Sequence, residues 1–218
     1  MNSIIVYRPN MIKALIFDFG SVMYRTNWEC MDHHFFQQHG FHIRLGDLPD
    51  EKLLEAYRAS DTGKGDLRSF FLCLQPTLTK KKLDAVLRTY HQCYIHCKIV
   101  NHDLLRWIRE LKKSYSLFGF TDVKQEHYAA NIEAGIYKEF IRIFTSFEFQ
   151  MTKAEPGAFS KLIVALTSYH LSPSECVFID DYLPNIEHAQ KTGFHTIHYT
   201  SFPDIQPLQH ALSALLHA

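Results

Sequence analysis

The chain has 218 residues, of which 46% are hydrophobic and 21% are charged, and its formal net charge at pH 7 is zero. This composition supports a sizeable core and excludes extensive disorder. The balanced charge gives no reason to expect nucleic acid or an anionic membrane as the main partner. The length suits one domain, or a core domain that carries a smaller insert.

The five cysteines are an odd number, and in a chain of this size they argue against a disulfide scaffold. The sequence has no secretory signal pattern and no apolar run long enough to span a bilayer. We therefore expect a soluble cytoplasmic protein without a membrane partner. Residues 1–10 do not continue the pattern that follows, so we expect them to form an N-terminal extension.

The apolar run at 12–17 ends at Asp18 and precedes Gly20, which is the pattern of a buried strand followed by a tight turn. From about Asn27 to Tyr94, apolar residues recur at helical spacing. A polar, glycine-containing loop at 60–66 divides this stretch, and no strand pattern interrupts it. We interpret it as a small helical insert.

Strand-like and helix-like segments alternate in the remainder of the chain. The expected strands are 115–120, 143–147, 176–179 and 194–199. Such alternation predicts a parallel sheet with helices on both faces. We therefore expect a Rossmann-like α/β core of residues 11–24 and 98–218, with an all-helical cap of residues 25–97 inserted after the first strand.

Polar residues follow the predicted strands, where parallel sheets bind their ligands. These residues are Asp18, Thr121 with Asp122, Lys153, and Asp180 with Asp181, followed by Asn185. A carboxylate at such a point can attack phosphorus and form an aspartyl-phosphate. Carboxylates and backbone carbonyls also suit Mg²⁺, while a lysine and a hydroxyl group can bind phosphate oxygens.

Each of these residues also has a structural interpretation. Thr121 and Asp122 can cap a helix, Lys153 can be a solvated charge, and adjacent acids can cap the helix near Pro184. Their order at successive strand ends favours one shared site over separate structural roles.

The sequence resembles the haloacid dehalogenase-like (HAD) hydrolase superfamily. The motifs that carry this resemblance are FDFGSV, the threonine of GFTD, the lysine of TKAEP, and FIDDYLPN, and the likeness covers about residues 11–200. It is closest to the Asp-x-Gly-x-Val branch, which includes glucose-1-phosphatase-like members with a helical cap. The resemblance implies a Mg²⁺-dependent phosphatase that acts on a small, sugar phosphate-like metabolite.

The resemblance also implies roles for individual residues. Asp18 would be the nucleophile, and the Gly20 carbonyl and Asp181 would join it around Mg²⁺. The phosphoryl group would be bound by Thr121, Asp122 and Lys153, while Asp180 and Asn185 would support the site.

Two positions depart from the family pattern. Gly20 replaces the aspartate that serves most of these phosphatases as acid and base, and Asp122 stands where asparagine is common. The first departure leaves two alternatives open. One is a metal-independent 2-haloacid dehalogenase-type hydrolase, and the other is a weakly active or non-catalytic binding protein.

Two further groups have weaker patterns. His91, Cys93, His96 and Cys97 form a dense cluster, but their spacing matches no usual zinc pattern, so we favour helix packing over a zinc site. Lys64 and Arg68, near the cap loop, are candidates to contact the polar end of a substrate, with solvated surface charges as the alternative.

Overall fold

The computed structural model describes residues 11–43 and 51–216, so the expected extension of residues 1–10 lies outside the described residues. Within the described ranges the main sheet is five-stranded, in the order β5-β4-β1-β6-β7, and all of its pairings are parallel. Its strands are β1 (Ala14–Phe17), β4 (Ser116–Thr121), β5 (Arg142–Thr145), β6 (Cys176–Asp180) and β7 (His195–His198).

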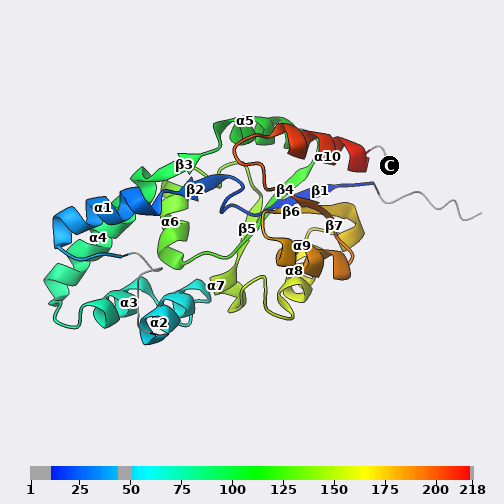
Figure 1. The fold of residues 1–218 in the computed structure, drawn as a ribbon. Coiled ribbons are helices and arrows are strands. Elements are labelled where there is room, and N and C mark those ends of the chain that lie inside the picture. Colours follow the sequence, from blue (N-terminus) through cyan, green and yellow to red (C-terminus); the bar gives the residue numbers. More distant parts are fainter. Residues whose placement is uncertain (1–10, 44–50, 217–218) are drawn as a thin grey trace, which may run out of the picture.

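Alternate residues of β1 face two different hydrophobic clusters. Leu15 and Phe17 pack in the cluster that includes residues of helices α5 (His102–Leu111) and α10 (Gln206–Leu216). Ala14 and Ile16 pack in the cluster that includes residues of α8 (Ala158–Thr167) and α9 (Leu183–Lys191). Helices therefore cover both faces of the sheet, with α5 and α10 above it and α8 and α9 below it in Figure 1. The predicted α/β fold class is confirmed.

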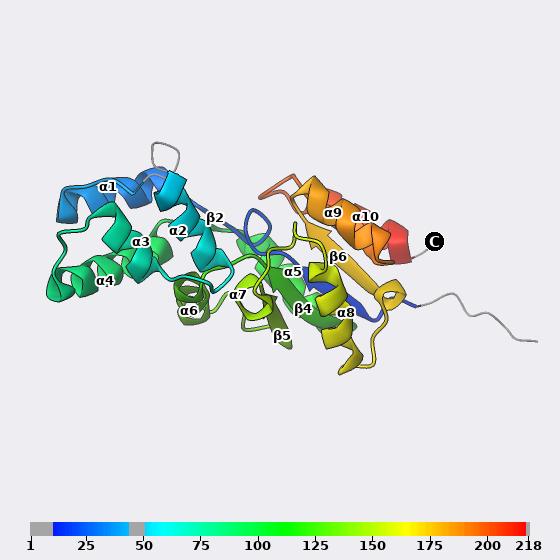
Figure 2. The same ribbon diagram turned by 90° about the horizontal axis from the view of Figure 1, so that it is seen from below.

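The helices of the expected cap region are α1 (Trp28–His39), α2 (Glu51–Asp61), α3 (Leu67–Leu74) and α4 (Lys80–His96). They gather at one end of the molecule (Figure 2), away from the outer strand β7 (Figure 1). Side chains cap the first turns of three of them, because Asn27, Asp66 and Thr79 accept backbone N–H groups of α1, α3 and α4. Helix α4 packs against α6 (Gln125–Glu133) of the core.

A short antiparallel pair joins the cap helices to the core. Strand β2 (Tyr24–Thr26) leads into α1, and β3 (Lys98–Val100) follows α4. This pair was not predicted from the sequence, because three residues are too few to show the alternation of a half-buried strand. The predicted strand at 143–147 also ends earlier, because Ser146 begins the short helix α7 (Ser146–Phe149), which the Thr145 side chain caps.

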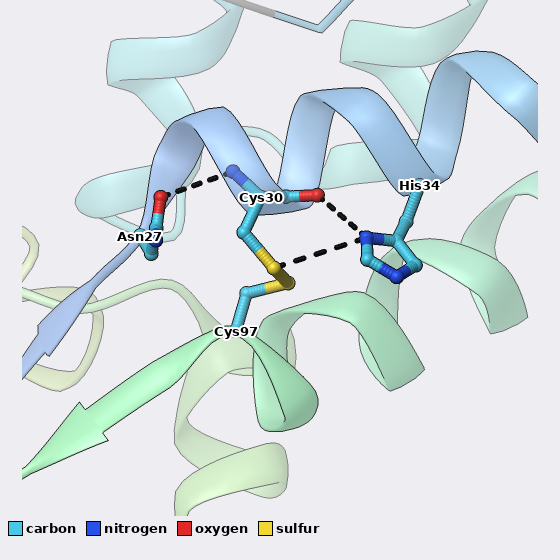
Figure 3. The surroundings of a disulfide bond; sticks show 4 residues. All are labelled: Asn27, Cys30, His34 and Cys97. Atoms are coloured by element: carbon cyan, nitrogen blue, oxygen red, sulfur yellow. Dashed lines mark hydrogen bonds between the residues drawn. A yellow bond between two sulfur atoms is a disulfide. The ribbon is translucent and has the colours of Figure 1, made fainter.

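A disulfide bond joins Cys30, in the first turn of α1, to Cys97, at the end of α4 (Figure 3). The two Cα atoms are 5.9 Å apart, although the residues are separated by 67 positions in the sequence. The odd cysteine count argued against a disulfide scaffold, and this single bond was not predicted because the count indicates no particular pairing. Cys73, Cys93 and Cys176 are free. No helix among the described residues is long and apolar enough to cross a membrane.

Candidate active site

The strands β1, β4 and β6 end side by side and present polar residues at the same edge of the sheet. Phe17 lies opposite Gly119 of β4 and Ile179 of β6. The backbone N–H of Asp18 donates to the Ile179 carbonyl at 2.8 Å and continues the ladder by one residue. Asp18 therefore lies beside Asp180, the last residue of β6.

Lys153 connects these two carboxylates. Its Nζ atom lies 2.6 Å from Asp18 Oδ1 and 2.6 Å from Asp180 Oδ2. The exposed fractions of the Lys153, Asp18 and Asp180 side chains are 3%, 9% and 1%, so this contact is almost fully removed from water. Lys153 is therefore a buried ion-pair partner and not the solvated surface charge that was its alternative interpretation.

Asp181 completes a group of three acids. Asp18, Asp180 and Asp181 each offer a carboxylate oxygen, and these oxygens lie within 4.8 Å of one another. Burial raises the pKa of Asp18 to about 7, and Asp180 adds to this shift while Lys153 opposes it. Burial alone would lower the pKa of Lys153, but Asp18 and Asp180 hold it above its ordinary value. The group has more carboxylates than cations, which favours the binding of a further cation.

Asp180 has the most complete set of partners of the three acids. Its Oδ1 atom accepts the Tyr182 backbone N–H at 2.8 Å, and the Asn185 side-chain amide lies 3.2 and 3.1 Å from its two oxygens. Asn185 is in the first turn of α9 and is 4% exposed. These bonds hold Asp180 in place at the end of β6.

Gly20 lies close to the carboxylate of Asp18. The nearest atom to a Cβ built at Gly20 is Asp18 Oδ2, at 3.8 Å, which is an ordinary van der Waals contact. The position therefore has room for a side chain that would face the carboxylate. The chain turns at the next residue, where Ser21 has a φ of 56° and donates its N–H to the Tyr24 carbonyl.

Asp122 contacts Lys153 from the end of β4. Its Oδ1 and Oδ2 atoms lie 3.0 and 3.2 Å from the backbone nitrogen of Lys153. His188 of α9 contacts the same residue, with Nδ1 3.5 Å from the Lys153 carbonyl oxygen. Thr121 ends β4 and is 2% exposed. The contacts of Asp122 and His188 were not predicted, and no local pattern signals them.

A cavity of about 810 Å³ lies between the cap and the loop that carries Lys153. Its lining residues are almost all charged or hydroxyl-bearing: Glu51, Lys52, Glu55, Arg58, Ala59, Asp61, Thr62, Lys64, Thr152 and Glu155. Lys64, one of the two cap residues considered from sequence, lines this cavity. Arg68, the other one, is instead paired with Asp84 at 2.7 Å.

The histidine and cysteine cluster of α4 is divided among separate contacts. His91 pairs with Glu133 at 2.7 Å, Cys93 is buried and free, and Cys97 is bonded to Cys30. Within the part of the chain that the structure describes, the groups whose ligand atoms lie close enough to hold a metal ion are Asp18 with Asp180 and Asp181, and Cys30 with His34 and Cys97, of which Cys30 and Cys97 are disulfide-bonded. The second group includes two residues that the sequence analysis did not single out.

No protein-family model matches this sequence, and no curated protein resembles it at a significant level. Solved structures do match. The HAD family enzyme BT-2542 from Bacteroides thetaiotaomicron has a TM-score of 0.73 and 18% identity, over 91% of this chain and 98% of that one. A structure of that enzyme contains magnesium and inorganic phosphate.

Two further structures have the same fold. A predicted HAD-like family hydrolase from Porphyromonas gingivalis has a TM-score of 0.69 and 20% identity, over 95% of this chain and 99% of that one. The 2-haloacid dehalogenase from Pseudomonas syringae has a TM-score of 0.64 and 16% identity, over 94% and 100% of the two chains. The chain therefore has the fold of the HAD-family hydrolases, and the resemblance noted in its motifs is confirmed at the level of fold.

Proposed function

We propose that this protein is a Mg²⁺-dependent phosphatase of small phosphorylated metabolites, with Asp18 as its nucleophile. The observation that carries this proposal is the position of Lys153, whose ammonium group contacts both Asp18 and Asp180 at the end of the sheet. The magnesium and phosphate complex of BT-2542, which has the same fold, supports the proposed ligands.

The residues fit a magnesium ion on chemical grounds. The available donors are carboxylate oxygens that lie close together, and Mg²⁺ prefers oxygen ligands. Asp18, Asp181 and the Gly20 carbonyl would hold the ion, while Asp180 would stay bound to Lys153 and Asn185. When bound, the ion would neutralise negative charge on the phosphoryl group and on the acids.

The side chains of this protein would perform the remaining steps. The Lys153 ammonium and the Thr121 hydroxyl would bind phosphoryl oxygens and orient the phosphorus towards Asp18. The deprotonated Asp18 carboxylate would attack phosphorus, forming an aspartyl-phosphate as the bond to the leaving oxygen breaks. Water would then hydrolyse this intermediate. Positioning and charge stabilisation provide most of the catalysis in such reactions.

Gly20 limits the range of substrates. A positioned acid is worth about two to four orders of magnitude in rate, and Gly20 has no side chain to supply one. We therefore infer a substrate whose leaving group departs without strong protonation. The charged and hydroxyl-bearing lining of the cavity between the cap and the loop that carries Lys153 suits a hydrophilic molecule.

A second candidate is a 2-haloacid dehalogenase-type hydrolase. It is supported by the similar fold of the Pseudomonas syringae dehalogenase and by Gly20, because halide is a leaving group that needs no acid. The excess of carboxylates over cations around Asp18 favours the metal-dependent phosphatase instead.

The test is phosphate release from p-nitrophenyl phosphate and a panel of sugar phosphates, with Mg²⁺ or with a chelator. We expect release that requires Mg²⁺ and is abolished in Asp18→Asn. Asp103→Asn, an exposed acid on α5, is the matched control and should behave as wild type. Chelator-insensitive halide release from 2-chloropropionate would support the dehalogenase. Equal activity of wild type and Asp18→Asn would contradict both.

A further inference from the structure

Cys30, His34 and Cys97 bring two sulfur atoms and an imidazole together where the chain enters and leaves the cap helices. Cys30 lies in the first turn of α1, His34 lies one turn further along, and Cys97 ends α4. Figure 3 shows the His34 ring directed towards the disulfide from the adjacent turn of α1. None of the three residues belongs to the motifs of the proposed active site.

The distances suit a shared ion. His34 Nδ1 lies 3.8 Å from Cys30 Sγ, and the three donor atoms lie within 4.8 Å of one another. Ligand atoms that share a tetrahedral zinc ion lie about 3.5–4 Å apart, as follows from Zn–S and Zn–N bonds of about 2.3 and 2.0 Å. After reduction the two sulfur atoms need to separate to that distance, and side-chain rotation at two cysteines 5.9 Å apart at Cα provides this separation.

The exposure of the three residues also suits metal binding. Cys97 is buried, Cys30 is partly buried and His34 is exposed, so the group is reachable from solvent on the His34 side. A water molecule can complete a coordination shell there, as in zinc sites with three protein ligands. Two thiolates and an imidazole form a soft donor set that favours Zn²⁺ over Mg²⁺.

We propose that reduction converts the Cys30–Cys97 disulfide into a zinc site formed by Cys30, His34 and Cys97. Two equivalents of a small thiol reduce the disulfide, giving two protein thiols and one small-molecule disulfide. Zn²⁺ binding then displaces one proton from each thiol. Re-oxidation by a small-molecule disulfide such as oxidised glutathione reforms the bond, regenerates two small thiols and releases the ion.

His34 must change its hydrogen bonding in this transition. Its Nδ1 atom lies 2.9 Å from the Cys30 carbonyl oxygen, so in the disulfide form this nitrogen carries the proton and donates it. In the zinc form the proton moves to Nε2, and the Nδ1 lone pair binds the ion. The exposure of His34 leaves Nε2 in contact with water, where it can carry that proton.

The proposed site preserves a link between α1 and α4 under reducing conditions. Without the disulfide, the start of α1 is held to the end of α4 by the β2–β3 pairing and the bond from the Asn27 N–H to the Cys97 carbonyl, at 2.8 Å. A zinc ion bound to Cys30 and Cys97 replaces the covalent link with coordination. The two ends of the cap would then stay joined to each other in either redox state.

The experiment titrates Zn²⁺, or Co²⁺ as its spectroscopic substitute, into metal-free protein reduced with a phosphine. Excess Mg²⁺ is present so that it occupies the acids around Asp18. We expect one ion per chain and the sulfur-to-cobalt charge-transfer absorption that reports thiolate ligands. Cys30→Ser and Cys97→Ser should abolish this absorption, and His34→Ala should weaken binding by at least about tenfold.

The matched controls are Cys73→Ser, at the exposed free cysteine, and His33→Ala, at the neighbouring histidine that contacts Gln37. Both should bind zinc as wild type does. Oxidised glutathione should release the ion and remove two titratable thiols in wild type but not in Cys30→Ser.

Zinc binding by wild type no tighter than by Cys30→Ser, or equal loss in Cys73→Ser, would overturn the proposal. His34→Ala keeps the disulfide, so it tests the site even where a cysteine variant fails to fold. Each readout is independent of phosphatase activity.

Discussion

Both carboxylate oxygens of Asp122 face the backbone N–H of Lys153, at 3.0 and 3.2 Å from its nitrogen. This contact links the end of β4 to the irregular loop between α7 and α8, from which Lys153 reaches Asp18 and Asp180. We infer that Asp122 positions Lys153, whereas the resemblance implies that Asp122 binds the phosphoryl group directly.

Substitution of Asp122 separates these two roles. Asp122→Ala removes the acceptor and should lower kcat/KM by about tenfold to a hundredfold, since a hydrogen bond to a charged group is worth about 1.5–3 kcal/mol. Asp122→Asn keeps an acceptor oxygen and should stay within about threefold of wild type. Hydrogen exchange of the peptide that contains Lys153 should quicken in Asp122→Ala only. An equal loss in both variants would show that the charge itself is needed.

Removal of the Lys153 ammonium should affect both activity and stability. Lys153→Met leaves Asp18 and Asp180 buried without their cation, and loss of one member of a buried ion pair costs about 3–5 kcal/mol. We expect that decrease in the free energy of unfolding, measured with denaturant in the absence of Mg²⁺, and about a hundredfold to thousandfold loss of kcat. The control Lys112→Met removes an exposed ion pair with Glu139 and should change stability by less than about 1 kcal/mol.

Gly20→Asp should improve hydrolysis of substrates with poor leaving groups. The position faces Asp18 Oδ2 and accepts a Cβ without a clash. An acid placed there should raise kcat/KM for alkyl phosphates by about two to four orders of magnitude, with little effect on p-nitrophenyl phosphate. Gly20→Asn has nearly the same shape without the acidic proton and is the matched control. Equal rates of Gly20→Asp and Gly20→Asn on alkyl phosphates would show that the missing acid is not the limitation.

His127 should make the stability depend on pH. Its ring lies nearly parallel to the rings of Tyr90 and Tyr94 of α4, with centroids 5.6 and 3.8 Å away, and its Nε2 atom lies 3.0 Å from the Tyr90 hydroxyl oxygen. Burial lowers the pKa of His127 well below its ordinary value of 6.5, and Lys124 adds to this effect. The unfolded chain therefore takes up a proton near pH 6.5 that the folded chain does not.

The contribution of His127 to the free energy of unfolding is therefore complete above about pH 6.5. Below that pH the free energy of unfolding decreases by about 1.4 kcal/mol per pH unit, until the folded protein also takes up the proton. Denaturant unfolding of wild type and His127→Phe between pH 7.5 and pH 5 measures this loss. We expect a steeper decrease in wild type than in His127→Phe, which keeps a ring in the stack. Parallel curves would contradict the assignment.

The order of the strands along the chain, and the polar residues that end them, were predicted from the sequence alone. A central strand of a parallel sheet is buried on both faces, so it appears as an apolar run, and the first polar residue after it marks the edge of the sheet. This rule located Asp18, Thr121 and Asp180, because burial acts on each strand locally. The short strands β2 and β3 were not found by this rule, because three residues are too few to show a strand pattern of hydrophobic residues.

The contacts between these residues depend on how distant segments pack. Lys153 is 135 positions from Asp18, and Cys97 is 67 positions from Cys30. Such proximities follow from strand register and from helix packing, which local hydrophobic periodicity does not encode. For the histidine and cysteine cluster of α4, the sequence favoured helix packing over a zinc site, and the members do have separate contacts, since residues adjacent in a helix point in different directions. The partner of Cys97 is a cysteine of another helix and was not predicted.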